Sequence, residues 1–199
     1  QPPITIDAPQ GFVFHHVNAY EKDSKIILES IFYDDFPSVG PNENFKEIDF
    51  ETYPEGKLKR SIIDLKERTS KLTCISEQCC EFATVNPNFL GIEASYSWMA
   101  STEKKIGNAP LQSIKKINLK TKEEIFWSAA PKGFVSEPIM VPKRNSCFED
   151  EGYLLVIIWN GERRGSDLII LDAHNLKELA TYNLPISIPH GLHGSWASH

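Results

Sequence analysis

The feature that most constrains the fold is a repeat with a period of 54 residues, marked by Asp64, Asn118 and Asp172. Each of these residues ends a short apolar run and is followed by a polar turn and a second apolar run. An Asp or Asn that leaves a strand can accept hydrogen bonds from its own turn, which favours a tight connection. A period of about this length, with several strands per unit, is typical of β-propeller blades. Three unrelated hairpins with coincidental spacing are the alternative.

The other apolar runs also indicate strands. They are short, rich in Ile, Val, Phe and Tyr, and bounded by Gly, Pro, Asn and Asp, as strands usually are. No long stretch keeps a helical period with caps. We therefore expect an all-β fold, with strands that include residues 12–17, 26–32, 111–119, 153–159 and 168–171.

The number of repeat units bears on the extent of the domain. A propeller closes on itself with about 4–8 blades, whereas this chain carries roughly three to four units of its own period. The chain also begins with Gln1 instead of methionine. We expect residues 1–199 to be one part of a single propeller domain, with a small complete propeller as the alternative. Such a partial propeller would expose strand edges, so we expect it to aggregate or to require the missing blades for closure.

Composition excludes several classes of function. The net charge of -6 argues against nucleic acid as a partner, because phosphate binding needs clustered Lys and Arg. No run of about 18 apolar residues is present, so no membrane-spanning helix is expected. Cys74, Cys79, Cys80 and Cys147 lack a CxxC…CxxC spacing, which favours reduced thiols over a zinc or redox cluster. We expect a cytoplasmic protein, or a plastid or peripheral membrane protein in a eukaryote.

Three histidines are candidate metal ligands. His15 and His16 are neighbours in an expected strand, where successive side chains point to opposite faces, so only one of them can face a shared site. The spacing does not say which. His193 lies between Gly191 and Gly194 in a short non-helical stretch, and glycine permits close backbone approach. Taken alone, His15 and His16 fit a satisfied core or surface histidine better than a metal ligand, and the short stretch around His193 is a weak metal signal.

Two glutamates lie in apolar surroundings. Glu81 and Glu137 interrupt otherwise apolar runs, and a buried carboxylate needs a partner. A metal-bound histidine offers one, because its free ring N–H commonly donates to a carboxylate; a glutamate on a strand edge that faces water is the alternative. A neutral all-histidine ligand set with open positions suits Fe(II). The chain contains no P-loop, nucleophile elbow, HExxH or dinucleotide-binding glycine motif.

Five motifs, in the same order along almost the whole chain, resemble those of the carotenoid cleavage oxygenase family, which includes the retinoid isomerase and the lignostilbene dioxygenases. They are residues 12–21 (FVFHHVNAYE), 81–87 (EFATVNP), 136–142 (SEPIMVP), 149–155 (EDEGYLL) and 184–194 (LPISIPHGLHG). The departures are Ala83 for the usual Pro, His190 for the common Tyr and Leu192 for Phe.

The resemblance implies a seven-bladed propeller with Fe(2+) on four histidines near its axis. By position, His15 and His193 correspond to two of the iron ligands, and Glu81 and Glu137 to carboxylates that we pair with His15 and His193 respectively. His16 and His190 do not match ligand positions. The segments that carry the other two ligands have no counterpart in this chain. The resemblance therefore implies that residues 1–199 are the C-terminal part of a single propeller domain, and we expect the chain alone to be inactive.

The implied activity of the intact protein is that of a non-haem iron(II) dioxygenase. Its partners would be O₂ and an apolar polyene, a carotenoid or apocarotenoid, whose C=C bond is cleaved to give carbonyl products. The resemblance also implies peripheral membrane contact for the full-length protein. The alternatives are a non-catalytic apocarotenoid-binding partial propeller and stilbene cleavage of the lignostilbene type. An interaction propeller of the kelch or WD type is not supported, because this chain lacks the repeat signatures of those propellers.

Overall fold

The computed structural model of the chain is built from short antiparallel strands, as predicted. It describes residues 2–38, 44, 47, 49–108, 110–189 and 191–197. The strands are β1 (Phe12–Lys22), β2 (Lys25–Tyr33), β3 (Lys57–Asp64), β4 (Thr69–Ser76), β5 (Cys80–Thr84), β6 (Tyr96–Ser101), β7 (Ser113–Asn118), β8 (Glu124–Ser128), β9 (Gly133–Val135), β10 (Ile139–Pro142), β11 (Gly152–Asn160), β12 (Gly165–Asp172) and β13 (Glu178–Asn183), and a short 3-10 helix, η2 (Pro87–Phe89), follows β5. No helical segment in the described part of the chain has the length and hydropathy of a transmembrane helix.

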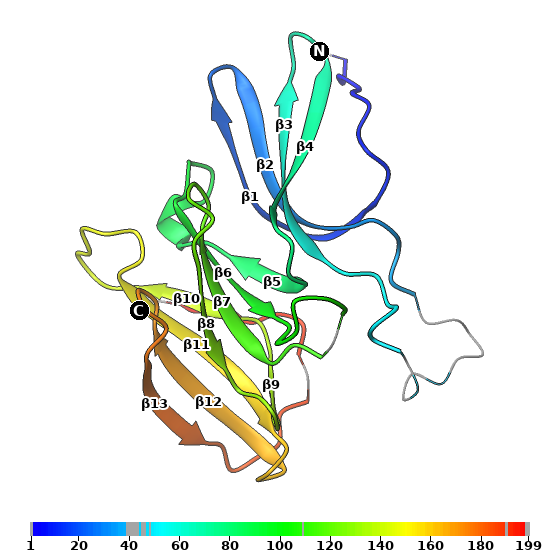
Figure 1. Cartoon of the computed structure of the whole chain (residues 1–199). Coiled ribbons are helices and arrows are strands. Elements are labelled where there is room, and N and C mark those ends of the chain that lie inside the picture. The colour runs from blue at the N-terminus through cyan, green and yellow to red at the C-terminus, as the bar shows by residue number, and fades with distance from the viewer. Residues whose placement is uncertain are drawn as a thin grey trace.

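The strands form three sheets that follow one another along the chain (Figure 1). The first has the order β1-β2-β3-β4, the second β5-β6-β7-β8, and the third β10-β11-β12-β13 with β9 also paired to β11. Each is an antiparallel meander, and none of the three closes on itself within the described residues. The all-β prediction is confirmed, and the repeated four-stranded unit is typical of propeller blades.

The 54-residue repeat marks the same turn in each sheet. Each marker is the last residue of the third strand in its four-strand order: Asp64 in β3, Asn118 in β7 and Asp172 in β12. In each case the side-chain Oδ1 accepts hydrogen bonds from the backbone N–H groups two and three residues later, at 2.8 to 3.3 Å. The residue four positions on is left-handed in every turn: Arg68, Lys122 and Leu176, with φ of 53°, 65° and 59°. The predicted tight turns are confirmed, and their equivalent places in the sheets argue against unrelated hairpins.

The middle sheet is covered on both faces, which explains its apolar sequence. Along β6, Met99 packs into the core shared with the first sheet, whereas Trp98 and Ala100 pack into the core shared with the third. All three side chains are fully buried. Figure 1 shows β5–β8 between the other two sheets, so the alternating side chains of one strand contribute to two cores.

Two adjacent lysines of β7 are buried within the same sheet. Lys115 donates to Ser76 Oγ at 2.6 Å, on the side of the first sheet. Lys116 donates to Asp150 Oδ2 and to the carbonyl oxygen of His174, both at 2.6 Å, on the side of the third sheet. Because neighbouring strand residues point to opposite faces, the pair ties the middle sheet to both of its neighbours.

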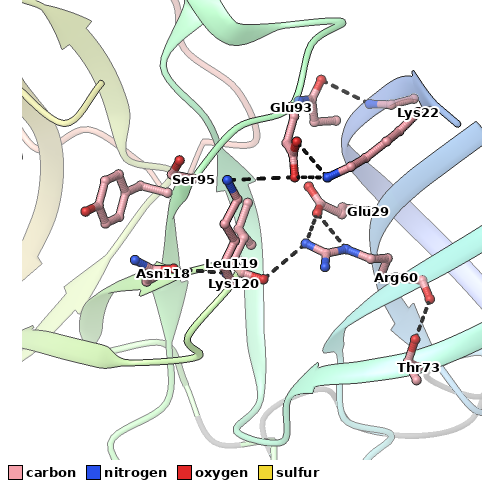
Figure 2. Close-up of polar contacts among 12 residues, drawn as sticks. Lys22, Glu29, Arg60, Thr73, Glu93, Ser95, Asn118, Leu119 and Lys120 are labelled. Carbon is pink, nitrogen blue, oxygen red and sulfur yellow. Dashed lines mark hydrogen bonds and ion pairs between the residues drawn. The ribbon is translucent and has the colours of Figure 1, made fainter. Parts of the chain in front are cut away.

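A second polar connection joins the first two sheets (Figure 2). Arg60 in β3 donates through Nε to Glu29 Oε1 at 3.0 Å and through Nη2 to the carbonyl oxygen of Leu119 at 3.2 Å. Nearby, Lys22 Nζ lies 2.7 Å from Glu93 Oε1. Burial raises the pKa of the Glu29 carboxyl, although the bonds from Arg60 oppose that shift. Glu29 Oε2 has no hydrogen-bond partner among the described residues.

We predict that Asp150→Ala lowers the free energy of unfolding by about 3–5 kcal/mol, because it leaves the buried Lys116 without its counter-charge. Glu162→Ala is the control, since its ion pair with Lys132 is exposed and its loss should cost less than about 1 kcal/mol. Urea unfolding of the intact protein carrying each substitution checks the prediction. Equal losses would contradict it.

Candidate metal centre

Three of the four candidate residues lie where the first strand of a sheet is irregular. The pairing of β1 with β2 shifts between Val13 and His16, so His15 lies inside the irregularity. The pairing of β5 with β6 shifts between Glu81 and Thr84. In the third sheet Glu137 lies in the gap between β9 and β10, both of which pair with β11. Such irregularities re-aim side chains, and here they occur at one candidate residue in each sheet.

His15 is held by Glu81, which comes from the neighbouring sheet. His15 Nδ1 lies 2.5 Å from Glu81 Oε2. The same carboxylate accepts the backbone N–H of Phe82 at 2.5 Å and, through Oε1, the hydroxyl of Tyr33 at 3.2 Å. Phe82 has a φ of 54°, an uncommon conformation for a bulky residue. The bulged backbone therefore turns its N–H group toward the carboxylate that orients His15.

His193 has an equivalent carboxylate partner. Its Nδ1 lies 3.3 Å from Glu137 Oε1, and the Gly194 N–H donates to Glu137 Oε2 at 2.8 Å. Gly194 lies beside β10, since a Cβ atom there would be 3.4 Å from Ile139 Cδ1. The two histidine–glutamate pairs expected from the sequence are thus both in contact.

The two imidazoles face each other. His15 Nε2 and His193 Nε2 are 3.3 Å apart, although the residues are 178 positions apart in the sequence. The carboxylates assign a proton to each Nδ1, which leaves both Nε2 atoms as acceptors. Two acceptors cannot bond to each other, so this arrangement needs a proton or a cation between them. Two nitrogens about 2.1 Å from one ion, with an angle of about 90–110° at that ion, would be about 3.0–3.4 Å apart, so the pair fits a shared metal ion.

The adjacent histidines have different partners, and only His15 faces His193. His16 is exposed and its Nδ1 lies 2.8 Å from Ser30 Oγ, away from this pair, whereas His190 lies outside the described residues. No group of three or more His, Cys, Asp or Glu side chains suited to a metal occurs in the described ranges. His15 and His193 therefore bring two imidazole nitrogens together, and such donors suit borderline metals such as iron, zinc and copper.

The cysteines do not contribute to this centre. All four are free, in agreement with the expected reduced thiols. Burial raises the pKa of Cys79 to about 12 and that of Cys80 to about 11. These thiols stay protonated near neutral pH, and a protonated thiol is a poor metal ligand.

The surroundings of the histidine pair are aromatic and apolar. The centroid of the Phe82 ring lies 5.2 Å from the ring centroid of His15 and 6.0 Å from that of His193. The exposed ring of Phe14 lies 6.5 Å from that of His15. Beside His193 is a hollow of about 300 Å³, whose lining includes Ile157 and Leu192. Sequence reasoning did not single out Phe82 or Tyr33, because each is one of many aromatic residues in apolar runs.

Comparison with known proteins shows similarity along nearly the entire chain. The family model described as retinal pigment epithelial membrane protein, RPE65, matches residues 2–198. Apocarotenoid-15,15'-oxygenase of Synechocystis is 41% identical over 194 residues, which cover 96% of this chain and 40% of that protein. The β,β-carotene 15,15'-dioxygenase of Gallus gallus is 28% identical over 214 residues, covering 92% of this chain and 40% of that protein.

A solved structure matches the fold closely. The crystal structure of cobalt-substituted Synechocystis apocarotenoid oxygenase superimposes with a TM-score of 0.94 at 40% identity, covering 98% of this chain and 41% of the other. The chain therefore spans about two fifths of the length of these relatives. On the strength of the family model and the 41% identity, this chain belongs to the RPE65 family, that of the carotenoid cleavage oxygenases.

Proposed function

We propose that, in the intact protein, His15 and His193 are two of the four histidine ligands of a non-haem iron(II), and that Glu81 and Glu137 orient them. The observation that carries this proposal is the 3.3 Å approach of the two Nε2 atoms, each on a ring whose Nδ1 faces a carboxylate. The ring–carboxylate bond holds each imidazole in one tautomer and one orientation, so that its lone pair is available to the metal.

We further propose that residues 1–199 form the C-terminal blades of a seven-bladed propeller domain. The three sheets would be three of the seven blades, somewhat over two fifths of the ring. That fraction agrees with the 41% of the Synechocystis structure that the chain covers. The remaining blades would close the ring and supply the other two ligands.

The reaction that we assign to the intact protein is cleavage of a carotenoid or apocarotenoid C=C bond by O₂, with two carbonyl products. Bound iron(II) would supply the open coordination positions that this oxygen chemistry requires. The residues of this chain bring two imidazole donors together and place apolar groups such as Phe14, Phe82 and Leu192 beside them, which the missing blades would cover in the intact protein. An apolar site excludes water and favours an apolar polyene as substrate.

The degree of similarity supports an apocarotenoid as the substrate class. The apocarotenoid oxygenase of Synechocystis is 41% identical to this chain, whereas lignostilbene-α,β-dioxygenase isozyme III of Sphingomonas paucimobilis is 27% identical. We therefore place an apocarotenoid ahead of a stilbene. The alternative is a protein that binds an apocarotenoid without cleaving it. A cleavage assay distinguishes this binding protein from an enzyme.

Replacing His193 by alanine should abolish O₂-dependent cleavage of an apocarotenal by the intact protein and reduce its bound iron, because one ligand is lost. His16→Ala is the matched control, since His16 is adjacent to His15 but bonds to Ser30 and should leave iron content and rate close to those of the wild type. Product analysis and metal content check both variants. A His193→Ala protein that retains the wild-type rate would refute the ligand assignment.

Glu137→Ala should weaken metal binding about 10–100-fold, the usual effect of removing a carboxylate that supports a ligand. The variant removes the acceptor for His193 Nδ1 and for the Gly194 N–H. Metal affinity of the intact protein, measured by competition with a chelator, checks this expectation, and the exposed Glu162→Ala serves as the control. Wild-type affinity in Glu137→Ala would show that Glu137 does not orient His193.

A further inference from the structure

Tyr33 lies behind the carboxylate that orients His15. We infer that Tyr33 is a positioning residue for the metal centre, because its hydroxyl holds Glu81 and Glu81 holds His15. The inference rests on the proposed function, since it assumes that His15 binds the metal.

The carboxylate of Glu81 has three donors around it, with different tasks. Oε2 accepts both the ring N–H of His15 and the backbone N–H of Phe82, each at 2.5 Å. Oε1 accepts the Tyr33 hydroxyl at 3.2 Å. Because Glu81 is only 9% exposed, water has little access to replace a missing donor. Without the Tyr33 hydroxyl, Oε1 would lose its hydrogen-bond donor. The carboxylate could then rotate, and the rotation would move Oε2 away from His15.

The phenol ring itself is fixed by close packing. Tyr33 is the last residue of β2 and is 4% exposed. The ring of Phe14 meets it edge-on at 5.5 Å. Gly56 provides the space for the phenol, since a Cβ atom there would lie 2.6 Å from Tyr33 Cζ and 2.7 Å from its hydroxyl oxygen. The glycine and the aromatic ring together leave the hydroxyl directed at Glu81.

The protonation of Tyr33 is suited to this task. Burial raises the pKa of the Tyr33 hydroxyl, and the nearby charge of Glu81 raises it further. A raised pKa keeps the proton on the oxygen at neutral pH, so the hydroxyl remains a donor wherever the carboxylate is ionised.

The second histidine has no equivalent support in the described part of the chain. Glu137 accepts only from His193 and from the Gly194 N–H in that region, and the side chain of His193 is 57% exposed. His15 is therefore held by a buried carboxylate that Tyr33 supports. Among the described residues His193 is held by Glu137 alone, and both of these side chains are more exposed to solvent. Changing Tyr33 should affect the His15 side of the centre alone.

Cobalt(II) titration of the intact protein tests the inference, with the dissociation constant and the visible absorption of the bound ion as readouts. Tyr33→Phe should raise the dissociation constant about 3–10-fold, less than the 10–100-fold effect of removing a direct partner of a ligand, and should shift the absorption bands. Tyr20→Phe is the matched control, because Tyr20 is also buried, at 7% exposed against 4% for Tyr33, but makes no hydrogen bond to Glu81. It should leave both readouts unchanged even if the melting temperature falls.

The outcomes separate this inference from the proposed function. A wild-type protein that binds no cobalt would overturn the proposed metal centre itself. Cobalt binding that is the same in wild type, Tyr33→Phe and Tyr20→Phe would overturn the role of Tyr33 alone. If Tyr33→Phe does not fold, 3-fluorotyrosine at position 33 provides a stronger donor of nearly the same volume and should tighten cobalt binding. An unchanged dissociation constant in that protein would also overturn the inference.

Discussion

The hydrogen bond between His15 and Glu81 joins the first strands of two different sheets, so the direction of the imidazole depends on how those sheets pack. Asn18, three residues further along β1, reinforces the same junction. Its side chain donates to the carbonyl oxygens of Phe89 and Ile92 and accepts the N–H of Gly91. A displacement of one sheet against the other would therefore break the backbone contacts of Asn18 as well as move the site.

The junction between the second and third sheets is built from motif residues of a different kind. The Glu149 carboxylate accepts the backbone N–H groups of Ser95 and Tyr96 at 2.8 Å, and the Glu149 carbonyl accepts from Asn86. Asp150 binds the buried Lys116. The acidic start of the 149–155 motif thus holds two sheets together, whereas His15, Glu81 and Glu137 of the candidate metal centre lie at the irregular first strands.

Local features could be predicted from the sequence, and features that depend on register could not. The 54-residue repeat predicted three equivalent turns because an Asx side chain bonds to its own turn. The sequence left His15 and His16 as alternatives, because a bulge in β1 changes which face a side chain takes. The burial of Lys115 and Lys116 was not predicted either, since their partners lie 39 and 34 positions away. The site assignment from the sequence came from the family resemblance, and Tyr33 had no motif to mark it.

The central claim is that His15 and His193 share one metal ion. Anomalous diffraction at the iron edge, from crystals of the intact protein loaded with iron(II), tests it most directly. We expect a single strong peak bonded to both Nε2 atoms, with the Nδ1 atoms still facing Glu81 and Glu137. Iron bound without one of these two histidines, or rings turned so that Nδ1 no longer faces its carboxylate, would contradict it.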